Sequence, residues 1–221
     1  MVRRQNNNKN YSKICRQMII ESSYEAEACH IGSALSCVDI LIDIFSNLRK
    51  GDFFIFSKAS GAAALYAILA EKGVIPRNKV AYYLKKYALP SKNIPGVIWS
   101  GGSLGHGLPA AVGLALGTKR KVYCLMSDAE LQEGTTWECL LFMKQHKLKN
   151  LEVIVDANGY QACGRIKDIL DLPYDFLKKS GFKIIKTIKG KGVSFMKNNN
   201  QWHYRNLDKK LYEKAICELS K

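Results

Sequence analysis

The chain has 221 residues, of which 47% are hydrophobic, so it is long and apolar enough to bury a full core. This composition excludes a disordered tail and a miniprotein held together by disulfides. The net charge is +15, and residues 178–221, with twelve basic against three acidic side chains, contribute +9 of it. Such a basic excess suits nucleic acid or an anionic small molecule. No aromatic-basic motif accompanies the charge, so we do not expect nucleic-acid binding.

The seven cysteines are an odd number without a CxxC pair, and several lie in apolar runs such as residues 122–126. Buried free thiols in a reducing compartment are the simplest interpretation, and the spacing is not that of a structural zinc site. The polar first ten residues lack the apolar segment of a signal peptide. No stretch reaches the ~18 apolar residues of a membrane span. We therefore expect a cytoplasmic protein that does not cross a membrane.

Helix-like and strand-like patterns alternate after an Asn-rich segment that predicts a disordered tail over residues 1–10. Helical spacing covers 14–24, 38–45 and 61–71, an apolar run at 53–56 predicts a strand, and Pro76 is expected in the first turn of another helix. Further along, the predicted order is helix 109–117, strand 121–126, helix 136–146, strand 151–155, helix 173–180, strand 183–188 and helix 207–219. This alternation predicts one α/β domain over residues 11–221, in which a parallel sheet carries helices on both faces.

Polar residues follow two predicted neighbouring strands, at the edge of the sheet where ligands bind in such folds. Asp128 follows the strand at 121–126, and Asn158 follows the strand at 151–155. A carboxylate and an amide oxygen at adjacent strand ends suit a hard cation such as Mg²⁺, which commonly also holds a phosphate. Capping of the next helix is an equally good interpretation of Asp128 alone.

A glycine-rich loop at residues 100–107 precedes the helix at 109–117, and such loops let backbone groups approach an anionic ligand. The segments GGSLGHGLPAAVGLALG, VYCLMSDAELQEGTTWE and LEVIVDANGYQ, in this order, closely resemble the thiamine diphosphate-binding half of transketolases. Residues 29–33, 57–66 and 186–203 resemble further segments of that family. The resemblance covers residues 12–205 and implies the family's three-layer fold.

The resemblance implies roles for individual residues. Asp128, Asn158 and the backbone carbonyl of Tyr160 match the ligands of the Mg²⁺ (or Ca²⁺) ion that holds the diphosphate. The other residues on the cofactor side are Ser60, Gly102, Leu104, Ala129 and Glu130. The residues expected in catalysis are His30 and His203, which match histidines near the diphosphate and substrate, and Glu133 and Glu138, which match a proton relay between two active sites. As isolated residues, the two histidines and the two glutamates are equally compatible with structural or solvent-exposed positions.

The sequence also departs from the family pattern. Ser127 and Ala129 replace the two glycines of GDG, and an alanine is costly if its position requires positive φ. Ser60 replaces the histidine of SKGH, residues 90–97 lack the family's His-Pro, and His106 replaces a common glutamine. Residues 181–185 join directly onto 186–188, where the family has a further helix and strand. We therefore expect a sheet trimmed by about one strand and one helix.

The resemblance implies the N-terminal subunit of a split transketolase, which uses thiamine diphosphate to transfer a two-carbon ketol unit between sugar phosphates. The carboxylate that activates the cofactor belongs to a pyrimidine-binding domain that this chain lacks, so a C-terminal transketolase subunit is the expected partner. The two active sites of the family imply self-association into a two-fold assembly. Two alternatives remain open: a thiamine diphosphate enzyme subunit with another donor or acceptor, and a non-catalytic regulatory paralogue.

Overall fold

The computed structural model describes residues 2–220, with side chains from residue 10 onward, and within this range it has one sheet of four parallel strands. The strands lie in the order β1 (Phe53–Phe56), β2 (Val122–Ser127), β3 (Leu151–Ala157) and β4 (Lys183–Lys186). In the register of the central pair, Val122 lies opposite Leu151 and Ser127 opposite Asp156. Because all strands are parallel, their carboxyl ends meet at one edge of the sheet.

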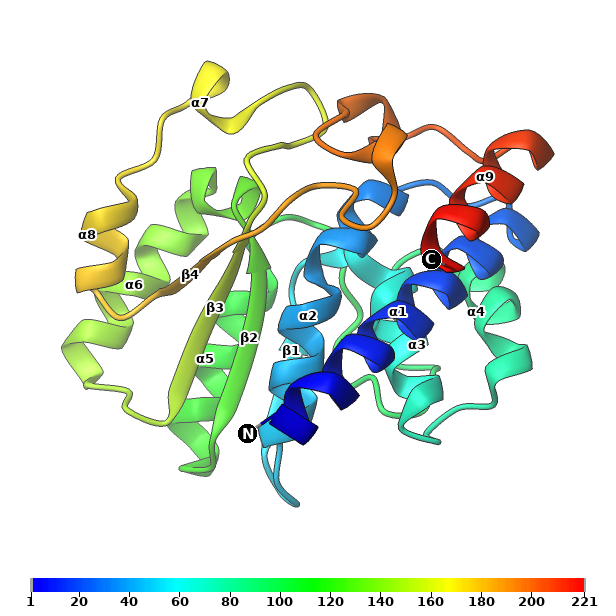
Figure 1. Ribbon diagram of the computed structural model, residues 1–221. Helices are drawn as coiled ribbons and strands as arrows, with labels where there is room; N and C mark the ends of the chain where they lie inside the picture. Colours follow the sequence, from blue (N-terminus) through cyan, green and yellow to red (C-terminus); the bar gives the residue numbers. More distant parts are fainter. Residues whose placement is uncertain (1, 221) are drawn as a thin grey trace.

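Helices cover both faces of this sheet, as the sequence predicted (Figure 1). Their bounds are α1 Val2–Glu25, α2 Ile31–Asn47, α3 Ala62–Glu71, α4 Val80–Tyr87, α5 Gly107–Thr118, α6 Gly134–His146, α7 Ile166–Ile169, α8 Tyr174–Lys179 and α9 Lys209–Ser220. Five short 3₁₀ helices complete the described elements: η1 Ala59–Gly61, η2 Arg77–Lys79, η3 Ala129–Gln132, η4 Ser194–Met196 and η5 Asn200–His203.

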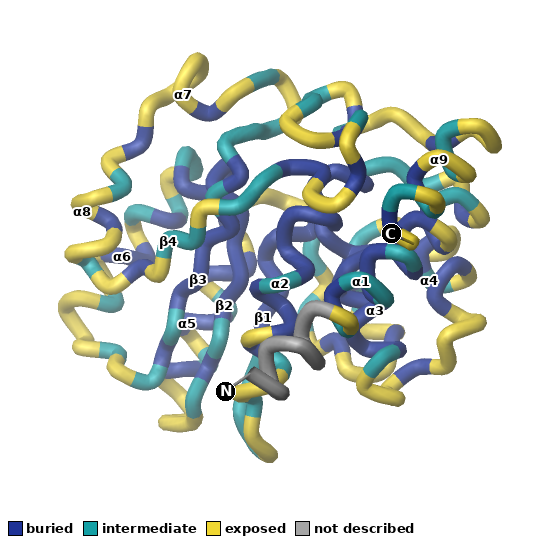
Figure 2. The backbone as a smooth tube through the Cα atoms, in the orientation of Figure 1, coloured by how far each residue is buried: buried dark blue, intermediate teal, exposed yellow. Residues whose placement is uncertain are grey.

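The period-two pattern of the strands divides the core into two layers. Leu125 and Ile154 face the core shared with α1, α2 and α3, whereas Cys124 and Val155 face the core shared with α5 and α6. Helix α2 lies near the centre of the molecule and most of its residues are buried (Figure 2). The expected three-layer α/β arrangement is therefore confirmed.

Most element bounds differ from the predictions by a few residues. Helix α2 begins seven positions earlier than predicted, at Ile31, and Pro76 precedes η2 rather than starting α4. The predicted strand at 183–188 ends at Lys186, since the chain then bends into a loop. Helix α7 was not predicted because it has only four residues.

Helix α1 begins at Val2, although a disordered tail was expected over residues 1–10. Residue 1 and the side chains of residues 2–9 lie outside the described part of the structure, so the domain boundary at residue 11 stays a prediction. Within residues 2–220, no helix combines the length and the apolar character that a transmembrane segment requires.

Candidate functional site

A cavity of about 240 Å³ opens where β1, β2 and β3 end. Its walls come from the segments that follow the three strands, from the glycine-rich loop and from η5. The lining residues are His30, Ser33, Lys58, Ala59, Ser60, Leu89, Gly102, Leu104, Ser127, Ala129, Tyr160, Gln161, Ala162, His203 and Tyr204. Six of the residues predicted for cofactor binding or catalysis, and Tyr160 of the predicted metal ligands, are in this set. Distant parts of the chain thus meet at the expected edge of the sheet.

A larger hollow of about 480 Å³ lies at the opposite, amino-terminal ends of the strands. Charged side chains dominate its wall and pair with one another: Lys121 Nζ lies 2.7 Å from one Glu152 oxygen, and Lys183 Nζ lies 3.8 Å from the other. Because these charges already neutralise each other, we assign the functional site to the smaller cavity.

Asp128 is fully buried at the end of β2, and its carboxylate accepts two backbone hydrogen bonds. Oδ2 accepts from the Gly159 amide at 2.6 Å and Oδ1 accepts from the Ala129 amide at 3.1 Å. Burial raises the pKa of Asp128 to about 6, although Lys58 opposes that shift. The second contact caps the short helix η3 and not α6, the helix that the sequence suggested Asp128 would cap, whose N-cap is Glu133. The first contact ties Asp128 to the turn after β3.

Asn158 lies next to this carboxylate in the turn that Gly159 continues. Its Oδ1 accepts from the Tyr160 amide at 3.0 Å, and its Nδ2 donates to Ser36 Oγ at 3.3 Å. The described residues contain no cluster of three His, Cys, Asp or Glu side chains that could hold a metal ion. A site made of one carboxylate, one amide oxygen and one backbone carbonyl belongs to a different class, and its all-oxygen donors suit Mg²⁺.

Two buried lysines, Lys58 and Lys189, place positive charge at the cavity. The Lys58 ammonium lies 3.3 Å from Asp156 Oδ2, and both side chains are almost completely buried. Burial lowers the pKa of Lys58, but the carboxylates of Asp156 and Asp128 outweigh this and hold the pKa above its usual value. Burial, together with the positive charge of Lys58, lowers the pKa of Lys189 to about 8.

These residues fit a metal-bound diphosphate. The buried ammonium of Lys189 has no carboxylate as a hydrogen-bond partner in the described structure; it donates instead to Asn200 and His203. A diphosphate in the cavity, which Lys58 lines, would offset the excess positive charge of the two lysines without contacting Lys189 itself, and a divalent cation would compensate the buried Asp128 carboxylate.

His30 and His203 meet edge to face at the cavity wall, with 4.9 Å between their ring centroids. The His30 amide donates to the His203 carbonyl at 2.9 Å, which fixes the two segments together. Burial and the nearby Lys189 charge lower the pKa of both rings, that of His203 to about 3. Both imidazoles are therefore neutral at pH 7.

Of the remaining predicted residues, one group lines the cavity and the other lies outside its wall. The first group consists of Ser60, Gly102, Leu104 and Ala129. Residue 129 does not have positive φ, so alanine in place of the family's glycine causes no backbone strain.

Glu130 lies outside the cavity wall, because its buried carboxylate accepts hydrogen bonds from Ser57, Ser127 and the Gly105 amide. It holds together the ends of β1 and β2 and the glycine-rich loop. Glu133 is half-buried and Glu138 is exposed on α6, and neither lines the cavity.

The sequence interpretation missed three residues: Lys58, Asp156 and Lys189. Lys58 and Lys189 lie inside segments that were recognised by resemblance, but lysines are usually exposed and nothing local marks these two as buried. Asp156 precedes Asn158 by two positions in a buried strand, and that pattern could have identified it.

The comparisons with known proteins agree with this geometry. The family described as "Thiamine pyrophosphate enzyme, C-terminal TPP binding domain" matches residues 80–211. An apulose-4-phosphate transketolase subunit of Phocaeicola vulgatus is 31% identical, over 93% of this chain and 91% of its own length. The chain belongs to the transketolase family.

Other members of the transketolase family match as well. The 6-deoxy-6-sulfo-D-fructose transketolase subunit SqwG of a Clostridium strain is 26% identical over 95% of both chains. Human transketolase is 27% identical over 90% of this chain but only 40% of its own length. The transketolase structure from Campylobacter jejuni, 22% identical, superposes with a TM-score of 0.85 over 96% of this chain and 42% of that chain. This chain therefore spans less than half the length of human transketolase and of the Campylobacter jejuni transketolase.

The Phocaeicola alignment extends over 256 positions, whereas 93% of this chain is about 205 residues, so about 50 positions have no counterpart here. This shortening is consistent with the expected loss of about one strand and one helix relative to the family.

Proposed function

We propose that this chain is the N-terminal, diphosphate-binding subunit of a two-chain, Mg²⁺-dependent transketolase. The observation that carries the proposal is the joint placement of Lys58, Lys189, Asp128 and Asn158 at one edge of the sheet. It is supported by the match to relatives that are themselves named as transketolase subunits, over 91% and 90% of their length, compared with 40% of human transketolase. A cytoplasmic location is part of the proposal and is supported by seven free cysteines.

Residues of the cavity wall, and Asp128 and Asn158 buried beside it, have separate roles in holding the cofactor. Asp128, Asn158 and the Tyr160 carbonyl would hold the metal ion, and the Lys58 ammonium would neutralise the diphosphate. Gly102 and Leu104 in the glycine-rich loop would contact the aminopyrimidine ring. When bound, thiamine diphosphate supplies the nucleophilic carbon that accepts a two-carbon ketol unit from a ketose and passes it to an aldose.

The side chains of this chain bind and orient the sugar. His30 and His203 are neutral, so each offers one ring N–H to a hydroxyl or carbonyl oxygen without adding charge. The apolar wall of Leu89, Leu104 and Ala129 excludes water from the reacting carbon. Ser60 offers a hydroxyl where the family has an imidazole, which favours a donor or acceptor different from that of other transketolases.

The outer face of α5 and α6 is the surface that we assign to the partner subunit. Leu116, Leu141 and Phe142 are 48%, 69% and 39% exposed on these helices. Gly113 and Gly117 have open space where a side chain would lie, so another helix can approach closely. Glu133 and Glu138 lie on or beside the same face and would carry protons across the assembled interface.

The test is a thermal-shift measurement on this chain assembled with a subunit that carries a pyrimidine-binding domain. Thiamine diphosphate and Mg²⁺ together are expected to raise Tm, and Asp128→Asn is expected to abolish the Mg²⁺-dependent part. Asp43→Asn, at the opposite end of the sheet, is the matched control and is expected to keep the full shift. Absence of any shift in the wild-type complex would favour the regulatory paralogue.

Consumption of phosphorylated ketoses, compared with pyruvate, then tests the substrate class. The proposed two-carbon transfer requires a ketose phosphate to be consumed and a longer sugar phosphate to form. Consumption of pyruvate alone would support the alternative enzyme with another donor.

A further inference from the structure

The buried side chain of Lys189 ends between two hydrogen-bond partners from η5. Its Nζ lies 2.7 Å from Asn200 Oδ1 and 3.1 Å from His203 Nδ1. Lys189 is completely buried and does not line the cavity, whereas His203 does. Lys189 therefore influences the cavity indirectly, through its hydrogen bond with His203.

The chemistry of the two groups fixes the position of the imidazole proton. A lysine ammonium has three N–H donors and no acceptor, so His203 Nδ1 must accept the hydrogen bond. The neutral ring then carries its proton on Nε2. Among the described residues, Nε2 of His203 makes no hydrogen bond, so this N–H is available to a ligand in the cavity.

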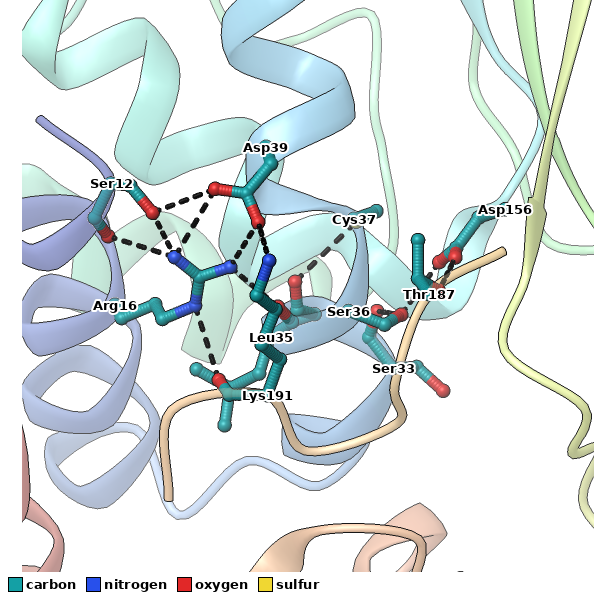
Figure 3. Close-up of polar contacts among 11 residues, drawn as sticks. Ser12, Arg16, Ser33, Leu35, Ser36, Cys37, Asp39, Asp156, Thr187 and Lys191 are labelled. Atoms are coloured by element: carbon teal, nitrogen blue, oxygen red, sulfur yellow. Dashed lines mark hydrogen bonds and ion pairs between the residues drawn. The ribbon is translucent and has the colours of Figure 1, made fainter. Parts of the chain in front are cut away.

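The loop that carries Lys189 is fixed on both sides of that residue. Thr187 Oγ1 donates to Asp156, and the Lys191 carbonyl accepts from Arg16 Nε at 3.1 Å (Figure 3). The Lys191 ammonium also lies 2.7 Å from Asp39 on α2. Backbone hydrogen bonding continues this attachment, since the Gly190 amide donates to the Gly32 carbonyl at 2.9 Å.

The opposite end of the contact is fixed as well. Asn200 Nδ2 donates to the Ala162 carbonyl at 3.0 Å, which orients the amide so that Oδ1 faces the ammonium. Gly32 leaves room for the lysine stem, because a Cβ there would lie 3.2 Å from Lys189 Cγ. The ammonium is thus held at His203 by its own loop, by α2 and by the segment after β3.

We propose that Lys189 is a positioning residue that holds His203 in the Nε2–H form, so that His203 acts toward the cavity ligand as a hydrogen-bond donor and not as a base. The identity of that ligand, an oxygen of the sugar or of the diphosphate, rests on the function proposed above. The tautomer of His203 does not depend on the proposed function, because it is a property of the chain without any ligand.

The test is ¹⁵N NMR of histidine-labelled full-length chain at pH 7, without cofactor or partner. The chain has 4 histidines, so the spectrum is simple, and His203→Asn assigns the resonances of interest. In the wild type we expect an unprotonated Nδ1 and a protonated Nε2. In Lys189→Met, whose thioether donates no hydrogen bond, we expect the Nδ1 resonance to move and an Nδ1–H population to appear.

Lys197→Met, an exposed lysine further along the same segment, is the matched control and should leave the His203 resonances unchanged. An Nδ1–H tautomer in the wild type overturns the proposal, and so do superimposable His203 resonances in wild type and Lys189→Met. If Lys189→Met does not fold, the wild-type tautomer still decides. If thiamine diphosphate and Mg²⁺ cause no thermal shift but NMR shows the Nε2–H tautomer of His203, the proposed function is refuted and this inference stands.

Discussion

Replacement of Lys58 by methionine removes one partner of the buried ion pair between Lys58 and Asp156. The two side chains are 1% and 0% exposed and their charged atoms lie 3.3 Å apart. At that distance the gross attraction is about 5 kcal/mol for an effective dielectric constant of about 20. Asp156 keeps donors from Ser36 and Thr187, so the net loss lies near the lower end of the range for broken buried pairs, about 3 kcal/mol.

Urea unfolding followed by circular dichroism measures this loss. With a slope of about 2 kcal/mol/M, the midpoint of Lys58→Met should fall by about 1.5 M. Lys121→Met, which breaks the partly exposed pair with Glu152, is the control and should cost less than about 1 kcal/mol.

A second variant separates the ion pair from packing. In Lys58→Met/Asp156→Asn neither member of the ion pair leaves the other as an unpaired buried charge, so at least about 1 kcal/mol of the loss should return even though Asp128 still loses the attraction of Lys58. A loss below about 1 kcal/mol in the single variant, or no recovery in the double variant, would show that the pair does not act as a buried ion pair.

Three further predictions follow from other contacts. Gly190→Ala should lower the free energy of unfolding by about 3 kcal/mol in urea titrations, because residue 190 has φ +74° and a Cβ would overlap the Met196 backbone; an unchanged midpoint would contradict this. Leu141→Asp should leave the melting temperature of the isolated chain unchanged and weaken partner binding at least about tenfold in calorimetry, because Leu141 is 69% exposed on α6. Burial raises the pKa of Asp39, but Arg16, Lys191 and Ser12 outweigh this and hold it below its usual value. The stabilisation that ionised Asp39 gives the fold is therefore complete above its unfolded pKa of about 4, and it is lost as the pH falls through the folded pKa. Asp39→Asn should thus reduce the acid-induced loss of stability below about pH 4, and identical pH profiles would contradict the argument.

The layer order and the site location followed from the sequence because they depend on local patterns. The apolar runs at 121–126 and 151–155 became the central strands, and Asp128 and Asn158 met at their ends. The roles of Glu133 and Glu138 remain predictions, since they depend on an interface with another chain.

The electrostatics of the site were less predictable because they depend on long-range packing. Nothing near Lys58 or Lys189 in the sequence indicates burial, and both become buried only when α2, η5 and the strand ends close around them. Glu130 was expected beside the diphosphate, yet its carboxylate is occupied by donors from three separate segments. Such partners come from positions up to 73 residues apart, beyond the reach of local patterns.

Strand β4 ends the described sheet, and its four residues are exposed at Lys183 and Lys186 and half-buried at Ile184 and Ile185. An open edge next to two isoleucines would invite a strand from a second copy. Added in either direction, such a strand would bring more lysines against a short edge on which Lys186 makes no ion pair among the described residues, and so meet electrostatic repulsion. The shortened sheet can therefore stop at β4 without a covering strand and without promoting aggregation through its edge.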